Sequence, residues 1–139
     1  MENLYGYFGK QLRVTLDSKE ILKENIDASI LRKDLGGVGY ATRVLYDEIP
    51  EGTNALLPEN KLIFATSPLT ANRIPGGGSI MLCFKSPLTN TWGESRCGGD
   101  FGPHLKNAGY DALIIEGKSD HPVYLLSMMI MFLLGLPNI

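Results

Sequence analysis

The sequence predicts an α+β fold that is rich in β-strands and contains a few short helices. After Pro58, four apolar runs of strand length recur, rich in Ile, Leu and Phe. Helical patterns are short and carry recognisable start and stop residues. With 139 residues, of which 44% are hydrophobic, the chain can form one domain with a modest core.

The first elements expected are two strands joined by a tight turn. In "QLRVTLD", Leu12, Val14 and Leu16 recur at the two-residue period of a half-buried strand. The segment "KEILKEN" pairs with this strand across the turn at residues 17–18.

Two short helices follow. Asp27 is a good N-cap for a helix that carries Ile30, Leu31 and Leu35 and that the glycines at 36–37 end. A second helix runs from about residue 40 to residue 48 and is stopped by Pro50. Its inward side chains are Tyr40, Val44 and Leu45.

The segment between them, "GGVGYAT", imitates a dinucleotide-binding fingerprint. That fingerprint requires a preceding strand, whereas a helix precedes it here. We therefore interpret the segment as a turn between helices.

The four apolar runs are "KLIFAT", "SIMLCF", "DALIIEG" and "PVYLL", and we expect them to form much of one mixed sheet. The segment "GPHLKNAGYD" predicts a short helix with Pro103 in its first turn and Gly109 at its end.

The tetrapeptide Ser-Pro-Leu-Thr occurs twice, at 67–70 and 86–89, each time after an apolar run and before a glycine cluster. Because proline cannot continue a central ladder, we expect both strands to end there and both loops to lie at one sheet edge. The clusters at 76–78 and 98–99 then lie side by side.

Adjacent glycine loops let a ligand touch main-chain N–H groups, and Gly98 and Gly99 stand just before a helix start, where the dipole favours anions. Arg96 adds a planar donor fork suited to phosphate. Ordinary sheet-end loops remain an equal alternative.

Composition excludes several classes of function. The net charge of -2 leaves no basic stripe, which argues against nucleic acid as a partner. Cys83 and Cys97 form no CxxC pair and no zinc set with His104 and His121, so no metal site is expected. Neither histidine has a nucleophile or acid at catalytic spacing, and no catalytic residue is identified.

The two ends of the chain bear on location. The polar N-terminus lacks the apolar core of a signal peptide, and the two cysteines fit a reduced setting, so we expect a cytoplasmic protein. The apolar run at 123–136 is shorter than a membrane-spanning helix, which makes a membrane partner a weak alternative.

Three segments carry a family resemblance: "MENLYGYFGKQLRVTLDSKEI", "YDEIPEGTNALLPENKLIFATSPLT" and "KSPLTNTWGESRCGGDFGPHLKNAGYDALIIEGKSDHPVYL". From about Leu4 to Leu125 the chain resembles the N-terminal domain of the tungsten-containing aldehyde:ferredoxin oxidoreductases. The resemblance implies β-rich mixed sheets with an internal duplication, on which a tungstopterin lies. The doubled Ser-Pro-Leu-Thr is compatible with that duplication.

The resemblance also implies an activity. Members of the family, typically from anaerobic archaea and bacteria, oxidise aldehydes to carboxylic acids. They pass the electrons through a tungsten bis-pterin centre and a 4Fe–4S cluster to ferredoxin. The cluster cysteines, a second pterin loop and the substrate-binding residues belong to later domains. We therefore expect this chain to be a fragment that is inactive alone.

Carried over position by position, the cofactor-binding loop of the family falls on Arg96, Cys97, Gly98 and Gly99, and its pterin-contacting arginine falls on Ser79. The family has asparagine where Arg96 stands, and an asparagine oxygen can face a magnesium ion between pterin phosphates, whereas an arginine side chain offers only donors. If the family contact is made by the main chain, Arg96 keeps it, and magnesium stays a possible cofactor. We hypothesise that Arg96 replaces the cation missing at Ser79. The alternative is that Arg96 is a surface residue. Cys97 is expected to be a small loop residue, and Cys83 a buried, inert one.

The domain is expected to span residues 1–126, and 127–139 to form an aberrant apolar tail. Residues 128–131, Met-Met-Ile-Met, are encoded ATG ATG ATH ATG, and reading one base earlier gives two aspartates followed by Tyr, His or Asn. The tail is therefore interpreted as an out-of-frame extension, and its exposed apolar surface predicts self-association. Two alternatives stay open: a stand-alone pterin- or phosphate-binding module, and a small membrane- or subunit-associated protein that uses the tail.

Overall fold

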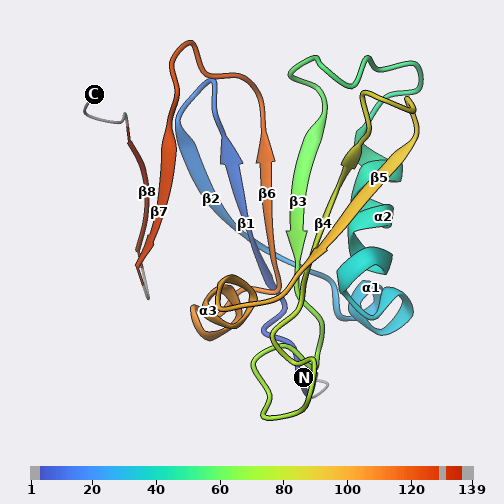
Figure 1. The fold of residues 1–139 in the computed structure, drawn as a ribbon. Helices are drawn as coiled ribbons and strands as arrows, with labels where there is room; N and C mark the ends of the chain where they lie inside the picture. The colour runs from blue at the N-terminus through green and yellow to red at the C-terminus, as the bar shows by residue number, and fades with distance from the viewer. Residues whose placement is uncertain (1–3, 129–130, 136–139) are drawn as a thin grey trace.

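The computed structural model describes residues 4–128 and 131–135. Three helices and eight strands occur in this described part (Figure 1). In chain order they are β1 (Lys10–Thr15), β2 (Glu20–Asn25), α1 (Ala28–Asp34), α2 (Gly37–Glu48), β3 (Lys61–Ala65), β4 (Ile80–Lys85), β5 (Trp92–Cys97), α3 (Phe101–Asn107), β6 (Ala112–Glu116), β7 (Tyr124–Met128) and β8 (Met131–Gly135).

A six-stranded mixed sheet forms the centre of the molecule, with strand order β2-β1-β6-β3-β4-β5. Strands β1 and β6 run parallel, and all other neighbours in this sheet are antiparallel. Strands β7 and β8 form a separate two-stranded sheet (Figure 1). The predicted α+β class is confirmed.

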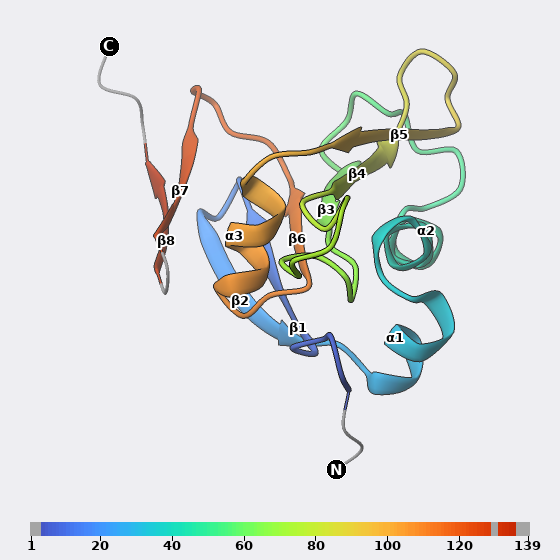
Figure 2. The same cartoon turned by 60° about the horizontal axis from the view of Figure 1, so that its bottom comes forward.

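The two faces of the large sheet are covered differently (Figures 1 and 2). Helices α1 and α2 cover one face, where Leu31 and Ala41 pack with Ile63 and Ile114, all essentially inaccessible to solvent. Helix α3 covers part of the other face through Leu105. Each fully buried Leu or Ile stabilises the fold by roughly 1.5–3 kcal/mol relative to exposure. Because successive side chains of a strand point to opposite faces of the sheet, the molecule has one hydrophobic core on each face.

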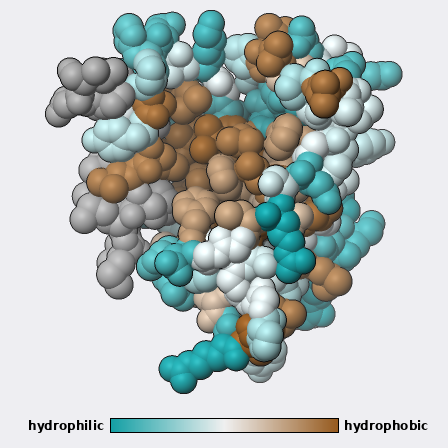
Figure 3. All heavy atoms as spheres, viewed as in Figure 1, coloured by the Kyte–Doolittle hydropathy of each residue, from teal (hydrophilic) through white to brown (hydrophobic). Residues whose placement is uncertain are grey.

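The second face is only partly covered. Figure 3 shows hydrophobic atoms gathered at the centre of this face, above α3. The half-buried residues Phe64, Leu16 and Ile115 pack against the second core, and Leu125 of β7 also touches it. Leu16 thus shares the face of Leu12 and Val14, as the strand period predicts.

The helix boundaries follow the caps, with one correction. Asp27 caps α1 as predicted, because its carboxylate accepts a hydrogen bond of 2.7 Å from the N–H of Ser29. The helix ends at Asp34, with the left-handed Leu35 at φ 59° as its C-cap, and not at the glycines. The pair Gly36–Gly37 instead begins α2, and the N–H of Gly37 donates to the carbonyl of Thr66 at 2.8 Å. Helix α2 therefore starts before residue 40, and the interpretation of "GGVGYAT" as a turn holds only at Leu35 and Gly36, because Gly37 to Thr42 form the first turns of α2.

Two strand predictions need correction. "PVYLL" does not join the large sheet, because β1 and β3 already occupy both edges of β6, and the later strand β7 pairs with β8 instead. Strand β5 was missed, since its residues read as part of a glycine loop, yet it pairs with β4 along its whole length. Strand β8 lies within the predicted tail, of which residues 129–130 and 136–139 fall outside the described residues.

The two Ser-Pro-Leu-Thr turns do not lie at one edge of the sheet, contrary to the prediction. Strands β3 and β4 are antiparallel, with Ile63 opposite Cys83, so the ends from which the turns depart point in opposite directions. The turn at 67–70 opens a long loop, whereas the turn at 86–89 closes the β4–β5 hairpin. Proline predicted where each strand ends but not the direction in which it runs.

Candidate functional site

The two glycine clusters meet at one end of the large sheet. Strand β4 begins just after the first cluster, β5 ends just before the second, and these strands pair with Ile80 opposite Cys97. A Cβ atom added to Gly78 would lie 3.2 Å from the carbonyl oxygen of Gly99. The predicted side-by-side placement is confirmed, and it is strand β5 that produces it.

Arg96 and Ser79 are in direct contact at this junction. The Nε and Nη2 atoms of Arg96 donate to Ser79 Oγ at 3.2 and 3.0 Å. Arg96 lies on strand β5, not in a loop, and the pairing of Met81 with Arg96 directs it toward this position. The two residues that the sequence related to each other are therefore neighbours, and the replacement of the cation missing at Ser79 by Arg96 stays a prediction.

A hollow of about 290 Å³ adjoins this contact. Its lining comes from the N-terminus of α2, the ends of β3 and β5, the first glycine loop and the start of β4: Gly37, Ala65, Ser67, Leu69, Ile74, Pro75, Gly76, Gly77, Ser79, Met81 and Arg96. Cys97, Gly98 and Gly99 are neighbours of this lining but do not belong to it. The exposed thiol of Cys97 donates to the carbonyl of Gly98 at 3.1 Å.

The first loop is held firmly around the hollow. Thr70 is buried, and its hydroxyl accepts from the N–H of Ser67 at 2.9 Å and donates to the carbonyl of Ser79 at 3.3 Å. These bonds tie the Ser-Pro-Leu-Thr turn to the residue that Arg96 contacts. The wall of the hollow is therefore preorganised.

Helix α2 adds a feature that sequence reasoning missed. Its N-cap, Gly36, makes no side-chain capping bond, and Gly37 lines the hollow. The N-terminus of a twelve-residue helix carries a partial positive charge that favours anions. The glycines of the rejected dinucleotide fingerprint could have predicted this helix start, because they do stand at the N-terminus of α2. The strand end beside this N-terminus is that of β3, which does not directly precede α2 in the chain.

The other candidate residues stand apart from this hollow. His104 lies on α3 and His121 in the segment before β7, and both are exposed. Cys83 is fully buried, and burial, with a smaller effect of Glu94, raises the pKa of its thiol to about 11. Within the described residues, no group of three or more His, Cys, Asp or Glu side chains could hold a metal ion. The same part of the chain contains no helix with the length and apolar character needed to cross a membrane.

Comparisons with known proteins agree on one family. Residues 11–127 match the family model described as "Aldehyde ferredoxin oxidoreductase, N-terminal domain". The chain is 48% identical over 122 residues to the tungsten-containing aldehyde ferredoxin oxidoreductase of Pyrococcus abyssi, covering 88% of this chain and 20% of the relative. It is 37% identical over 125 residues to a Pyrococcus furiosus protein named "Aliphatic sulfonate oxidoreductase, WOR-like subunit", with the same shares covered.

A solved structure has the same fold. It is described as "Active site complex BamBC of Benzoyl Coenzyme A reductase in complex with 1,5 Dienoyl-CoA". The TM-score is 0.91 at 33% identity, over 94% of this chain and 20% of the other. The chain thus spans about one fifth of the length of the curated relatives it matches, each share being 20%. The chain belongs to the aldehyde ferredoxin oxidoreductase family, and its residues 11–127 match the N-terminal domain of that family.

Proposed function

We propose that residues 1–126 are the tungstopterin-supporting domain of an oxidoreductase that converts aldehydes to carboxylic acids with ferredoxin as electron acceptor. The observation that carries this proposal is the Arg96–Ser79 contact beside the joined glycine clusters. The names of the relatives supply the reaction class and the tungsten.

The donors around the hollow fit a phosphate-bearing group. Arg96 offers a planar guanidinium fork, and the α2 N-terminus at Gly37 adds a favourable dipole. Arg96 and Ser79 would hold a pterin phosphate, and the main chain of Cys97, Gly98 and Gly99 would support the group alongside. When bound, the tungsten pterin supplies the redox chemistry.

The remaining cofactors are not expected to find ligands here. A guanidinium offers only donors, so the Arg96 side chain does not hold a magnesium ion. Of the two cysteines, Cys83 is buried and Cys97 exposed, and they provide no set for a 4Fe–4S cluster. We therefore infer that this chain has no oxidoreductase activity by itself.

A chimaera tests this function. The first fifth of the Pyrococcus abyssi relative is replaced by residues 1–126 of this chain, and tungsten content and aldehyde-dependent ferredoxin reduction are measured. We expect a tungsten-loaded, active chimaera, and roughly tenfold lower loading with Arg96→Gln, since that change removes charge-assisted hydrogen bonds. Arg73→Gln, at an exposed position of the first glycine loop, is the matched control.

The outcomes separate the two parts of the proposal. A folded chimaera that takes up no tungsten would contradict the domain's role. If the chimaera with Arg96→Gln contains as much tungsten as the chimaera without it, the proposed role of the domain stands and the proposed role of Arg96 is wrong.

A second candidate is a stand-alone pterin- or phosphate-binding module. It is favoured by the observation that the hollow, Arg96 and the α2 N-terminus are all supplied by one short chain. Calorimetric titration of the isolated chain with a pterin phosphate tests it. Heat of binding that disappears in Arg96→Gln supports the module, and no binding rejects it.

A further inference from the structure

A second, larger hollow lies at the opposite end of β4 from the glycine clusters. Its volume is about 730 Å³, within the range typical of small-molecule sites. The walls come from the second half of α2, the turn after it and the β4–β5 hairpin: Thr42, Leu45, Tyr46, Ile49, Pro50, Glu51, Gly52, Phe84, Lys85, Thr91 and Trp92. This hollow shares no residue with the one beside Arg96.

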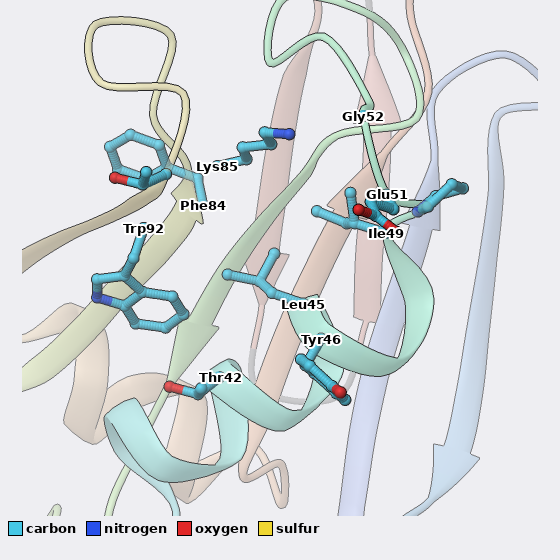
Figure 4. A pocket seen from close by; sticks show the side chains of 11 residues that line it. Thr42, Leu45, Tyr46, Ile49, Glu51, Gly52, Phe84, Lys85 and Trp92 are labelled. Carbon is cyan, nitrogen blue, oxygen red and sulfur yellow. The ribbon is translucent and has the colours of Figure 1, made fainter.

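Aromatic and aliphatic side chains make most of its surface. In Figure 4, Trp92 and Tyr46 lie on opposite sides of the hollow, and Leu45 lies between them. The Trp92 indole packs partly against the first core, and its Nε1–H donates to Glu94 at 3.0 Å. Tyr46 is 86% exposed, so its ring serves no core. Such walls favour a flat apolar ring system over a flexible or highly polar molecule.

Lys85 places one cation over this apolar surface. Its main chain is held on both sides by Asn60, whose side chain accepts from the Lys85 N–H at 3.1 Å and donates to its carbonyl at 2.9 Å. The amine extends across the hollow toward the turn at Gly52 (Figure 4). Among the described residues, no carboxylate forms an ion pair with this amine, although Glu51 lines the same rim.

The two threonine hydroxyls of the hollow are already engaged. The hydroxyl of Thr42 donates to the carbonyl of Val38 at 2.7 Å, and that of Thr91 bonds to Thr89 at 3.0 Å. Among the described lining residues Lys85 is the one cation, so its ammonium is the group expected to pair with an anionic ligand.

We propose that this hollow binds a planar, apolar organic acid. The flat ring system lies against the Trp92 indole, with Leu45 beneath it, and the carboxylate pairs with the Lys85 ammonium. The assignment rests on this hollow alone and does not depend on the function proposed for the glycine clusters.

Trp92 supplies the probe, because it is the only tryptophan in the sequence. The full chain is labelled with nitrogen-15, and its single indole N–H signal is followed by NMR during titration with 2-naphthoate. We expect a saturable shift of this signal. Neutral 2-naphthamide and the non-planar decalin-2-carboxylate should each bind at least about tenfold more weakly, because the first lacks the charge and the second the flat ring.

Variants assign the contacts. Lys85→Met should weaken the binding of 2-naphthoate about tenfold and leave the binding of 2-naphthamide unchanged. Lys85→Arg, which keeps the positive charge, should bind 2-naphthoate as the unaltered chain does. Lys23→Met, on the exposed strand β2, is the matched control, and Arg96→Gln should leave naphthoate binding intact.

Several results would overturn the site. They are the absence of a saturable shift, equal binding of acid and amide, and a Lys85→Met variant that binds the acid normally. An indole signal that moves with protein concentration instead of ligand would show that a second copy of the chain occupies the hollow.

Discussion

The two Ser-Pro-Leu-Thr segments have one sequence and two different structures. In the first, Thr70 is 3% exposed and its hydroxyl joins Ser67 to Ser79. In the second, Leu88 is 92% exposed, and Thr89 bonds only within its own turn among the interactions described. The difference comes from what each turn meets, since the first faces a glycine loop and the second faces solvent.

The same contrast extends to the ends of the sheet at which the turns lie. At the first end, Asp111 and Lys106 form a buried ion pair, and Asp111 also accepts from the N–H groups of Phe8 and Gly9 at 2.9 and 2.7 Å. At the second end, Glu116 pairs with Arg13 and Lys61 at the edge of solvent. A buried ion pair stabilises the end of the sheet that carries the proposed cofactor surface. Partly exposed ion pairs stabilise the other end.

Removing the buried cation should give the largest effect. Lys106→Met leaves the Asp111 carboxylate buried without its counterion, and we expect the free energy of unfolding to fall by about 3–5 kcal/mol. Urea unfolding followed by circular dichroism measures the change. The matched control is Lys85→Met, which removes a lysine at the other end and should change stability by less than about 0.5 kcal/mol.

The double variant Lys106→Met with Asp111→Asn tests whether the unpaired carboxylate of Asp111 causes the loss of stability. It removes the uncompensated charge and should recover part of the loss. Equal stability losses for Lys106→Met and Lys85→Met would contradict the contrast between the two ends.

The two glycine clusters should differ next. A Cβ on Gly77 would lie 2.6 Å from the carbonyl oxygen of Asn72, and a backbone atom cannot rotate away as a side chain can. A Cβ on Gly98 would meet nothing within 4 Å. We expect Gly77→Ala to cost about 1–3 kcal/mol and Gly98→Ala to be nearly neutral, as measured by thermal unfolding. A larger loss of stability for Gly98→Ala than for Gly77→Ala would contradict the prediction that the first cluster is the more tightly packed one.

A smaller effect is expected for the threonines of the two turns. Thr70→Val removes the acceptor for the Ser67 N–H in a buried place and should cost about 1–2 kcal/mol. Thr89→Val, in the exposed turn, should cost less than about 0.5 kcal/mol. Hydrogen exchange at Ser67 gives an independent measurement, because its amide should lose protection only in the Thr70 variant.

Sequence reasoning succeeded where a local pattern determines the structure. The period of Leu12 and Val14 gave β1, and the Asp27 cap gave α1, because both depend on neighbouring residues. It failed for β5, whose residues 93–96, Gly-Glu-Ser-Arg, have weak strand propensity and form a strand because β4 pairs with them. The direction of β4 relative to β3 likewise depends on tertiary pairing.

The candidate site shows the same limit. Family resemblance placed Arg96 and Ser79 as related positions, and their contact follows from the β4–β5 pairing. That Gly37 lines the same hollow could not be predicted, because α2 meets the end of β3 only in the folded chain.

The ion pairs of Glu116 with Lys61 and Arg13 should make the free energy of unfolding depend on pH. Burial alone would raise the pKa of Glu116, but hydrogen bonding and charge from Lys61, assisted by Arg13, lower it below its ordinary value of 4.5. A carboxylate with a lowered pKa in the folded state stabilises the protein above its unfolded pKa, and this contribution is lost as the pH falls through the folded value. Glu116→Gln should therefore lower the free energy of unfolding at neutral pH and lose less of it on acidification below about pH 4.5 than the unaltered chain. Urea unfolding at several pH values checks this, with the exposed Glu59→Gln as control. Parallel pH profiles for Glu116→Gln and the unaltered chain would mean that the Lys61 and Arg13 contacts do not stabilise this end of the sheet.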